Sequence, residues 1–242
     1  MKRAASYLSA LCLLILIISQ SIIFVTFFMP FFNWQYDRPR QYPPFNGMSA
    51  VETIGATHAD LIYVTTELLD YMRGRRDTLD GIRATVNGVE REFFSDLEKR
   101  HMIDVRVLYD ILFATRNIAF FLGTSLFIGM ALLQPPVLKP FFICCRHIIG
   151  GFLVLAGALA AIISINFDRA WTVFHLIFFN NDYWILTHRV DLLVDLVSLS
   201  FFLHISIFVG LLILIASLVV ISAGTFYLSR AKRRFDFGRT RS

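Results

Sequence analysis

Residues 196–228 read LVSLSFFLHISIFVGLLILIASLVVISAGTFYL, a run that contains no Asp, Glu, Lys or Arg. A helix needs about 20 consecutive apolar residues to cross the hydrocarbon core of a bilayer. The run exceeds that length, so it predicts a transmembrane helix rather than the core helix of a soluble domain.

Three further apolar runs occur along the chain, at 1–32, 111–133 and 141–165. Hydrophobic residues make up 56% of the sequence and charged residues 17%, whereas a soluble domain carries about 25% charged residues. We therefore predict an all-α membrane protein with four transmembrane helices. In the run 141–165, Gly150, Gly151 and Gly157 would let neighbouring helices approach closely.

The run at the N-terminus has a second interpretation, a secretory signal peptide, because Lys2 and Arg3 precede it. Its apolar stretch, Ala4 to Phe32, is longer than the roughly 7–15 apolar residues of a signal peptide. It also lacks a clear cleavage site of small residues near its end. A transmembrane helix is the better interpretation.

Two polar segments separate the runs, 33–110 and 166–195, and a basic tail, 229–242, follows the last one. Lys and Arg in short loops favour the cytoplasmic side of a membrane. The N-terminal head, the turn with Lys139 and Arg146, and the tail are all basic. The sequence therefore predicts a multi-pass cell-membrane protein whose two polar segments share the extracytoplasmic face.

The segment 33–110 predicts a mostly helical cap between the first two transmembrane helices. Apolar residues between Ala59 and Arg73 recur every three or four positions, which is typical of an amphipathic helix. Asn87-Gly88 predicts the turn of a small hairpin. Ser95 and Glu98 have the spacing of a capping box, which indicates that a helix begins near Asp96.

The charge and the cysteines exclude several classes of function. The net charge of +5 is concentrated in the basic tail, which fits topology and anionic lipid better than nucleic acid. Cys12, Cys144 and Cys145 all lie in or beside apolar runs. The polar segments therefore offer neither a disulfide nor a thiol nucleophile.

Two histidines, His101 and His175, lie in the polar segments close to transmembrane runs. Histidine is the side chain whose unperturbed pKa suits acid and base roles near neutrality. Either residue taken alone could be a structural residue of the membrane interface, but two at the same depth favour a site. The remaining histidines are weaker candidates: His58, His147, His188 and His204.

A metal site is an alternative use of these histidines, with His188, Asp182 and Asp191 as further ligands. No HExxH or CxxC spacing supports it, so we predict no metal. No GxSxG motif is present either, and the polar segments hold no cysteine, so a covalent acyl-enzyme has no obvious nucleophile. If acyl chemistry occurs, direct transfer assisted by a histidine base is its simplest course. The phenylalanines beside His175 could pack against lipid or line a groove for lipid tails, and the sequence leaves both open.

Two blocks of sequence, Phe93 to Arg106 and Phe174-His175-x-x-Phe178-Phe179-x-Asn181-x-x-Trp184, resemble a known family. It is a family of four-helix bacterial membrane proteins that includes the lipoprotein intramolecular transacylase. The resemblance implies a substrate lipoprotein whose N-terminal cysteine carries a diacylglyceryl thioether. The sn-2 acyl chain moves to the α-amine of that cysteine, with no cofactor, and gives an N-acyl lyso-form lipoprotein.

The resemblance also implies roles for individual residues. His101 and His175 would be the catalytic pair, and Glu98 or Asp104 would orient an imidazole by hydrogen bonding. Asn181 or Arg106 would stabilise the oxyanion. The residues expected to line the path of the acyl chain are Phe174, Phe178, Phe179 and Trp184.

A non-catalytic binding or chaperone subunit is the main alternative function. Claudins and tetraspanins have a similar two-loop topology but use extracellular disulfides, which this chain lacks there. A transporter is disfavoured because the predicted spans hold few charged groups. The distance between His101 and His175 distinguishes an enzyme from a non-catalytic subunit, because only an enzyme needs both histidines in one site. The partners expected for an enzyme are the lipoprotein substrate and membrane lipid, with the chain acting as a monomer.

Overall fold

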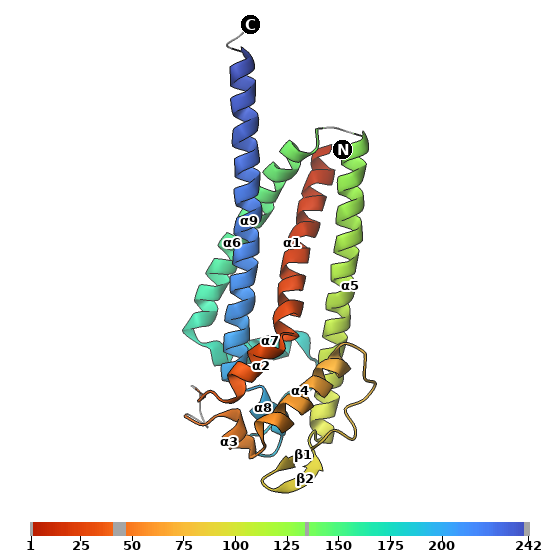
Figure 1. Cartoon of the computed structure of the whole chain (residues 1–242), viewed down its shortest axis with the longest axis vertical. Helices are drawn as coiled ribbons and strands as arrows, with labels where there is room; N and C mark the ends of the chain where they lie inside the picture. The colour runs from red at the N-terminus through yellow and green to blue at the C-terminus, as the bar shows by residue number, and fades with distance from the viewer. Residues whose placement is uncertain (1, 41–46, 134–135, 240–242) are drawn as a thin grey trace. The chain divides into compact units, whose positions relative to one another are not determined.

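The structure, a computed structural model, describes residues 2–40, 47–133 and 136–239, with side chains described as far as Lys232 (Figure 1). The elements in chain order are α1 (Lys2–Thr26), α2 (Met29–Tyr36), α3 (Ala50–Ile54), α4 (His58–Met72), β1 (Arg83–Val86), β2 (Val89–Glu92), α5 (Asp96–Leu133), α6 (Leu138–Ile165), α7 (Phe167–Phe178), α8 (Leu192–Leu196) and α9 (Leu199–Arg239). Four helices, α1, α5, α6 and α9, are long and apolar enough to cross a membrane. This confirms the prediction of a helical multi-pass membrane protein.

The first transmembrane helix is shorter than predicted, because α1 ends at Thr26 and not at Phe32. Pro30 lies in the first turn of α2, after Phe28 in an extended conformation. Proline lacks a backbone N–H and clashes with the carbonyl four residues earlier, so it kinks or ends a helix that would otherwise run through it. The prediction for 27–32 is therefore wrong, and the proline explains why.

The last transmembrane helix begins at Leu199, three residues after the predicted start at Leu196. Leu196 ends the short helix α8, and the φ and ψ angles of Val197 are −120° and 74°, outside the helical region. The Ser198 hydroxyl then accepts the Phe201 N–H at 3.5 Å, within the first turn of α9. At its other end α9 continues to Arg239, so helix covers much of the predicted tail 229–242.

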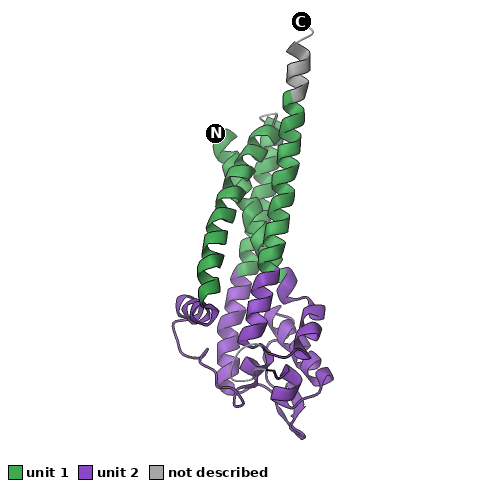
Figure 2. Ribbon diagram, turned by 90° about the vertical axis from the view of Figure 1, so that its left-hand side faces the viewer, with its two compact units in different colours: residues 1–23, 112–165, 209–242 green, residues 24–111, 166–208 purple. Residues whose placement is uncertain are grey.

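The chain divides into two compact units, coloured green and purple in Figure 2. Unit 1 comprises residues 1–23, 112–165 and 209–242. Inside it, α1 packs against α6 through a small cluster of buried residues: Ala10, Leu14, Cys144, Cys145 and Ile149. Tyr7 of α1 also hydrogen-bonds to His147 at 3.2 Å, and Ser6 contacts Met130 at 3.5 Å.

The close helix contacts of unit 1 occur at glycines other than those predicted. A Cβ at Gly123 would lie 2.8 Å from the Cys12 Cβ, and one at Gly224 would lie 2.9 Å from the Phe142 ring. A Cβ at Gly150, Gly151 or Gly157 would meet no described atom within 4 Å. The prediction for those three glycines is wrong, because a run of small residues does not reveal which face of the helix has a neighbour.

Unit 2 comprises residues 24–111 and 166–208. Strands β1 and β2 pair antiparallel, with Val86 opposite Val89. The connecting Asn87 and Gly88 have φ angles of 51° and 80°, as a two-residue type I′ turn requires. The predicted hairpin is confirmed, and it docks on α3 through a 2.8 Å bond from the Asn87 N–H to the Gly55 carbonyl.

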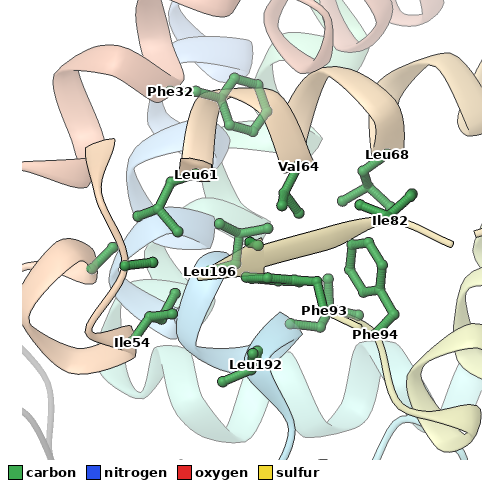
Figure 3. Packing of buried hydrophobic residues seen from close by; sticks show 14 of the residues in the cluster. Phe32, Ile54, Leu61, Val64, Leu68, Ile82, Phe93, Phe94, Leu192 and Leu196 are labelled. Carbon is green, nitrogen blue, oxygen red and sulfur yellow. The ribbon is translucent and has the colours of Figure 1, made fainter. Parts of the chain in front are cut away.

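The core of unit 2 joins segments that are far apart in the sequence (Figure 3). Phe32 of α2, Leu61 and Val64 of α4, Phe93 before α5 and Leu196 of α8 are all at most 4% exposed. Helix α4 confirms the amphipathic pattern predicted between Ala59 and Arg73. Burying this apolar face is what holds α4 and the hairpin together.

Helix α5 begins with the predicted capping box. Glu98 accepts the Ser95 N–H at 2.5 Å, and the Ser95 hydroxyl accepts the Glu98 N–H at 3.3 Å. All the acidic residues of α5 lie between Asp96 and Asp110, and Arg116 is the one charged residue after them. The apolar part that can cross the membrane therefore follows Asp110.

Candidate functional site

The candidate site is built on α5 and α7, two helices that contribute to unit 2. The Asn166 side chain accepts the Arg169 N–H at 2.9 Å and caps the start of α7. Apolar residues dominate one side of α7, and His175 lies in its last turn, 4% exposed. After Phe178 the helix ends, and the N–H of Phe179 donates to the His175 carbonyl at 2.8 Å.

The two predicted histidines lie together. The ring centroids of His101 and His175 are 6.0 Å apart, with an angle of 34° between the ring planes. His101 comes from the second turn of α5 and is 8% exposed. Segments separated by more than seventy positions in the chain therefore meet at this pair.

The tautomer of His175 follows from its hydrogen bond. Its Nδ1 lies 2.8 Å from the backbone carbonyl of Trp171, one turn earlier in α7. A carbonyl oxygen only accepts, so Nδ1 carries the proton and donates. In the neutral ring Nε2 is then the nitrogen with a free lone pair.

Aromatic rings enclose the histidines. The Phe179 ring lies 5.2 Å from the His101 ring and 5.6 Å from the His175 ring. Trp184 stacks on His175 at 4.7 Å, and Trp171 meets the same imidazole edge-on at 4.4 Å. Trp171 was not predicted, although its position four residues before His175 on a helix would have indicated the contact.

The other two predicted lining residues lie at the edge of this cluster. The rings of Phe174 and Phe178 are 4.7 Å apart, and Phe174 lies 5.4 Å from His175. They are 39% and 51% exposed, whereas Phe179 is buried. Phe174, Phe179 and Trp184 thus contact the His175 ring, and Phe178 packs on Phe174 at the exposed edge.

Burial keeps both imidazoles neutral. Desolvation, the largest cause, lowers the pKa of His101 to about 4; the repulsion that His175 would exert if both rings were protonated contributes to the shift, and Asp104 opposes it. The pKa of His175 is also lowered by burial, against the bond to the Trp171 carbonyl, which raises it. Near pH 7 each ring is therefore neutral, with one nitrogen protonated and the other able to accept a proton.

Asp104 and Asn181 form a link beside His101. The Asn181 side-chain amide donates to the Asp104 carboxylate at 2.9 Å, which ties the segment after α7 to α5. Asp104 acts on His101 through its charge, and the Nδ1 of His101 is buried with no hydrogen-bond partner among the described residues. The expected bond that would orient this imidazole is thus not formed at Nδ1.

Glu98 does not take the predicted place beside an imidazole. Its side chain is 0% exposed, and its two oxygens accept the backbone N–H groups of Ser95 and Leu193. These bonds hold the start of α8 against the start of α5. The expectation that Glu98 bonds to a histidine is corrected, because the capping box and α8 occupy its oxygens.

Arg106 also lies away from the histidines. Its Nη1 donates to the carbonyls of Arg76 and Asp77 at 3.2 and 3.4 Å, and its guanidinium lies 4.8 Å from the centroid of the Tyr71 ring. These contacts fix the loop that follows α4. They give Arg106 a structural role in place of the expected interaction with an oxyanion.

The remaining polar candidates form contacts of their own. His188 bonds to the buried Asp195 at 2.7 Å, and Asp191 accepts the Ser95 hydroxyl at 2.9 Å. His58 bonds to Asp37 at 2.9 Å. Among the residues that the structure describes, no three His, Cys, Asp or Glu side chains are grouped so that they could hold a metal ion.

Comparison with known proteins identifies relatives of this chain. Residues 7–202 match the family described as lipoprotein intramolecular transacylase Lit. A solved structure of the membrane integral lipoprotein intramolecular transacylase Lit from Bacillus cereus is similar over 97% of this chain and 98% of that chain, with a TM-score of 0.74 and 18% sequence identity.

Two further structures of the Bacillus cereus protein, each with one histidine substituted, match with TM-scores of 0.70 and 18% identity. They cover 97% of this chain and 94% and 96% of theirs. A search among curated proteins gives no match. At this identity the structures establish the fold, and the family match over residues 7–202 establishes the family: the chain belongs to the lipoprotein intramolecular transacylases.

Proposed function

We propose that the chain catalyses acyl transfer within bacterial lipoproteins, from the sn-2 oxygen of the diacylglyceryl group to the α-amine of the same N-terminal cysteine. The observation that carries this proposal is the pairing of His101 and His175, both buried, with ring centroids 6.0 Å apart. A non-catalytic role does not require two buried histidine rings to lie together.

The reaction balances without a cofactor or a second lipid. The amine nitrogen attacks the ester carbonyl carbon, a C–N bond forms, and the bond from that carbon to the glyceryl oxygen breaks. One proton moves from the amine nitrogen to the departing oxygen. Because donor and acceptor belong to one molecule, the product is an N-acyl lyso-form lipoprotein and a single copy of the chain suffices.

The two histidines are assigned different parts of this proton transfer. Nε2 of neutral His175 accepts the proton from the attacking nitrogen, since Nδ1 is held by the Trp171 carbonyl. The resulting buried imidazolium is a stronger acid than a free one and returns the proton to the glyceryl oxygen. His101, in the same aromatic cluster, hydrogen-bonds to the departing oxygen and positions that oxygen to receive the proton from His175.

Membrane anchoring dictates how the substrate arrives. Lifting the acyl chains into water would cost about 0.8 kcal/mol for each exposed CH₂ group. We therefore propose lateral entry from the bilayer, over the exposed rings of Phe174 and Phe178. The side chains of Phe179 and Trp184 must move aside for the ester to reach the buried histidines.

The decisive experiment is mass spectrometry of the N-terminus of a reporter lipoprotein coexpressed with this chain. The native chain should convert the diacylglyceryl form to the lyso form. His175→Ala should lower the rate by about 10²–10⁴, the range for loss of a general base, and His101→Ala, which removes the hydrogen bond to the departing oxygen, should also lower it strongly. The matched control is His58→Ala, which removes a half-exposed histidine bonded to Asp37. Full conversion by the His175 variant would refute the mechanism.

The alternative of a binding or chaperone subunit has a distinct outcome in the same assay. Such a protein would give no lyso product even in its native form, while still associating with lipoproteins. Unchanged diacylglyceryl reporter beside well-expressed native chain would therefore favour the subunit.

The extracytoplasmic location of the site is a separate part of the proposal. We expect cysteines introduced near Asn87 to react with a membrane-impermeant reagent added outside intact cells, and cysteines near Lys139 to react only after lysis. The native cysteines are buried and provide a low background. Labelling of both positions from one side would contradict this topology.

A further inference from the structure

A second polar atom beside the histidines has no partner. The indole nitrogen of Trp184, Nε1, is buried and makes no hydrogen bond to any described residue. Buried polar groups in folded proteins are almost always hydrogen-bonded, and a catalytic role is one of the explanations for an exception. His101 Nδ1, in the same cluster of rings, is the other unpartnered atom.

The chemistry of the indole N–H restricts which group can accept its hydrogen bond. An indole N–H donates and never accepts, so its partner must be an acceptor oxygen. Trp184 stacks on His175 at 4.7 Å with 26° between the rings, which fixes its orientation relative to the proposed base. In the proposed reaction the ester carbonyl is the acceptor oxygen next to that base, and it gains negative charge as the amine attacks.

The donors expected for this role are engaged elsewhere. One N–H of the Asn181 amide binds Asp104, and the Arg106 guanidinium is held by the carbonyls of Arg76 and Asp77. Among the described residues of the histidine cluster, the Trp184 indole nitrogen and His101 Nδ1 are both unpaired, and the indole is the one of the two that can only donate.

We infer that the indole N–H of Trp184 hydrogen-bonds to the ester carbonyl oxygen of the substrate and stabilises the oxyanion formed during acyl transfer. This inference rests on the proposed function. Trp184 is then a catalytic residue in addition to lining the path of the acyl chain.

The test removes the N–H and keeps the ring. Site-specific replacement of Trp184 by 3-benzothienylalanine puts sulfur in place of the indole N–H and leaves the shape nearly unchanged. With purified enzyme and a synthetic diacylglyceryl lipopeptide, kcat should fall by about 10²–10³, the loss found when one oxyanion donor is deleted. KM should stay constant, because the bond strengthens only in the transition state.

Two tryptophan variants serve as comparisons. Trp184→Phe should lose at least as much activity as the benzothienyl protein. Trp34→Phe, which removes an indole that packs on His204 and not on the site, should keep native activity. Native kcat in the benzothienyl protein would overturn the inference while leaving the proposed function intact. Absence of lyso product from the native enzyme would instead reject the proposed function.

Discussion

Units 1 and 2 differ in how they satisfy buried polar groups. In unit 1 buried serines such as Ser19 and Ser6 bond within their own helix, to the Ile15 carbonyl at 2.7 Å and the Lys2 carbonyl at 3.0 Å. Ser9 and Ser217, also buried in unit 1, have no hydrogen-bond partner among the described residues. In unit 2 the buried carboxylates bond to other segments of the chain. Glu98 accepts the N–H of Leu193, which is distant in the sequence, and Asp195 accepts the N–H of Arg189, which lies beyond its own turn of helix. Local bonding suits helices that contact lipid, whereas bonding between segments fixes the relative positions of side chains, as catalysis requires.

This difference predicts that unit 2 is the more sensitive to loss of one polar side chain. Glu98→Ala would leave the buried N–H of Leu193 and the partly buried N–H of Ser95 without acceptors. We expect a loss of about 2–5 kcal/mol in the free energy of unfolding. Thermal unfolding in detergent would measure it.

Glu90→Ala is the matched control, because Glu90 is exposed and pairs with Arg83 on the hairpin. It should change the free energy by less than about 0.5 kcal/mol. Equal stability of the Glu98 and Glu90 variants would show that the bonds between segments do not hold unit 2 together.

A change at the exposed edge of the aromatic cluster should affect activity and not folding. Phe178→Asp places a carboxylate where an acyl chain would pass, and a charge in hydrocarbon costs about 2.5–3.5 kcal/mol. Activity should fall by roughly 10²-fold, measured as lyso product by mass spectrometry. Phe178→Leu keeps the path apolar and should remain active. A folded and fully active Asp variant would remove Phe178 from the substrate path.

In unit 1, packing rather than polarity should dominate. Gly123→Ala puts a methyl group 2.8 Å from the Cys12 Cβ and should cost about 1–3 kcal/mol of stability. Gly150→Ala meets no described atom within 4 Å and should be neutral or slightly stabilising, since alanine favours helix. Thermal unfolding of both variants tests this contrast, and the reverse order of stability would contradict it.

The smallest effect should appear as a pH dependence of unit 2. Between the ordinary histidine pKa near 6.5 and the value of about 4 for His101, the unfolded chain binds more protons than the folded one. The free energy of unfolding therefore decreases as pH falls, by about 1 kcal/mol from His101 between pH 7.5 and 5.5. His101→Gln should show a smaller decrease than the native protein. An identical pH dependence would mean that His101 is not buried neutral.

Local patterns in the sequence predicted much of the fold. Hydropathy located the four long helices, the Asn87-Gly88 pair located the hairpin, and the spacing of Ser95 and Glu98 located the start of α5. Pro30 was available as a signal for the end of α1, but the continuous hydropathy of 4–32 obscured it. Helix ends depend on single residues, whereas helix identity depends on many.

The site was predictable only in part. His101 and His175 could be chosen by residue type and position, and their rings do meet. The partner of Glu98 could not be predicted, because the Leu193 N–H lies 95 positions away and any backbone amide could have served. The unpaired indole N–H of Trp184 could not be predicted either, because no sequence pattern indicates a missing hydrogen bond.

The contact of Trp171 and Trp184 with His175 gives the protein an optical property. Only three tryptophans are present, and two of them lie within 5 Å of one imidazole, measured between ring centroids. Protonation would change these ring contacts into cation–π contacts. Because indoles dominate the ultraviolet emission of proteins, we expect protonation of His175 to change the fluorescence of this chain, so that its titration can be followed without any added label.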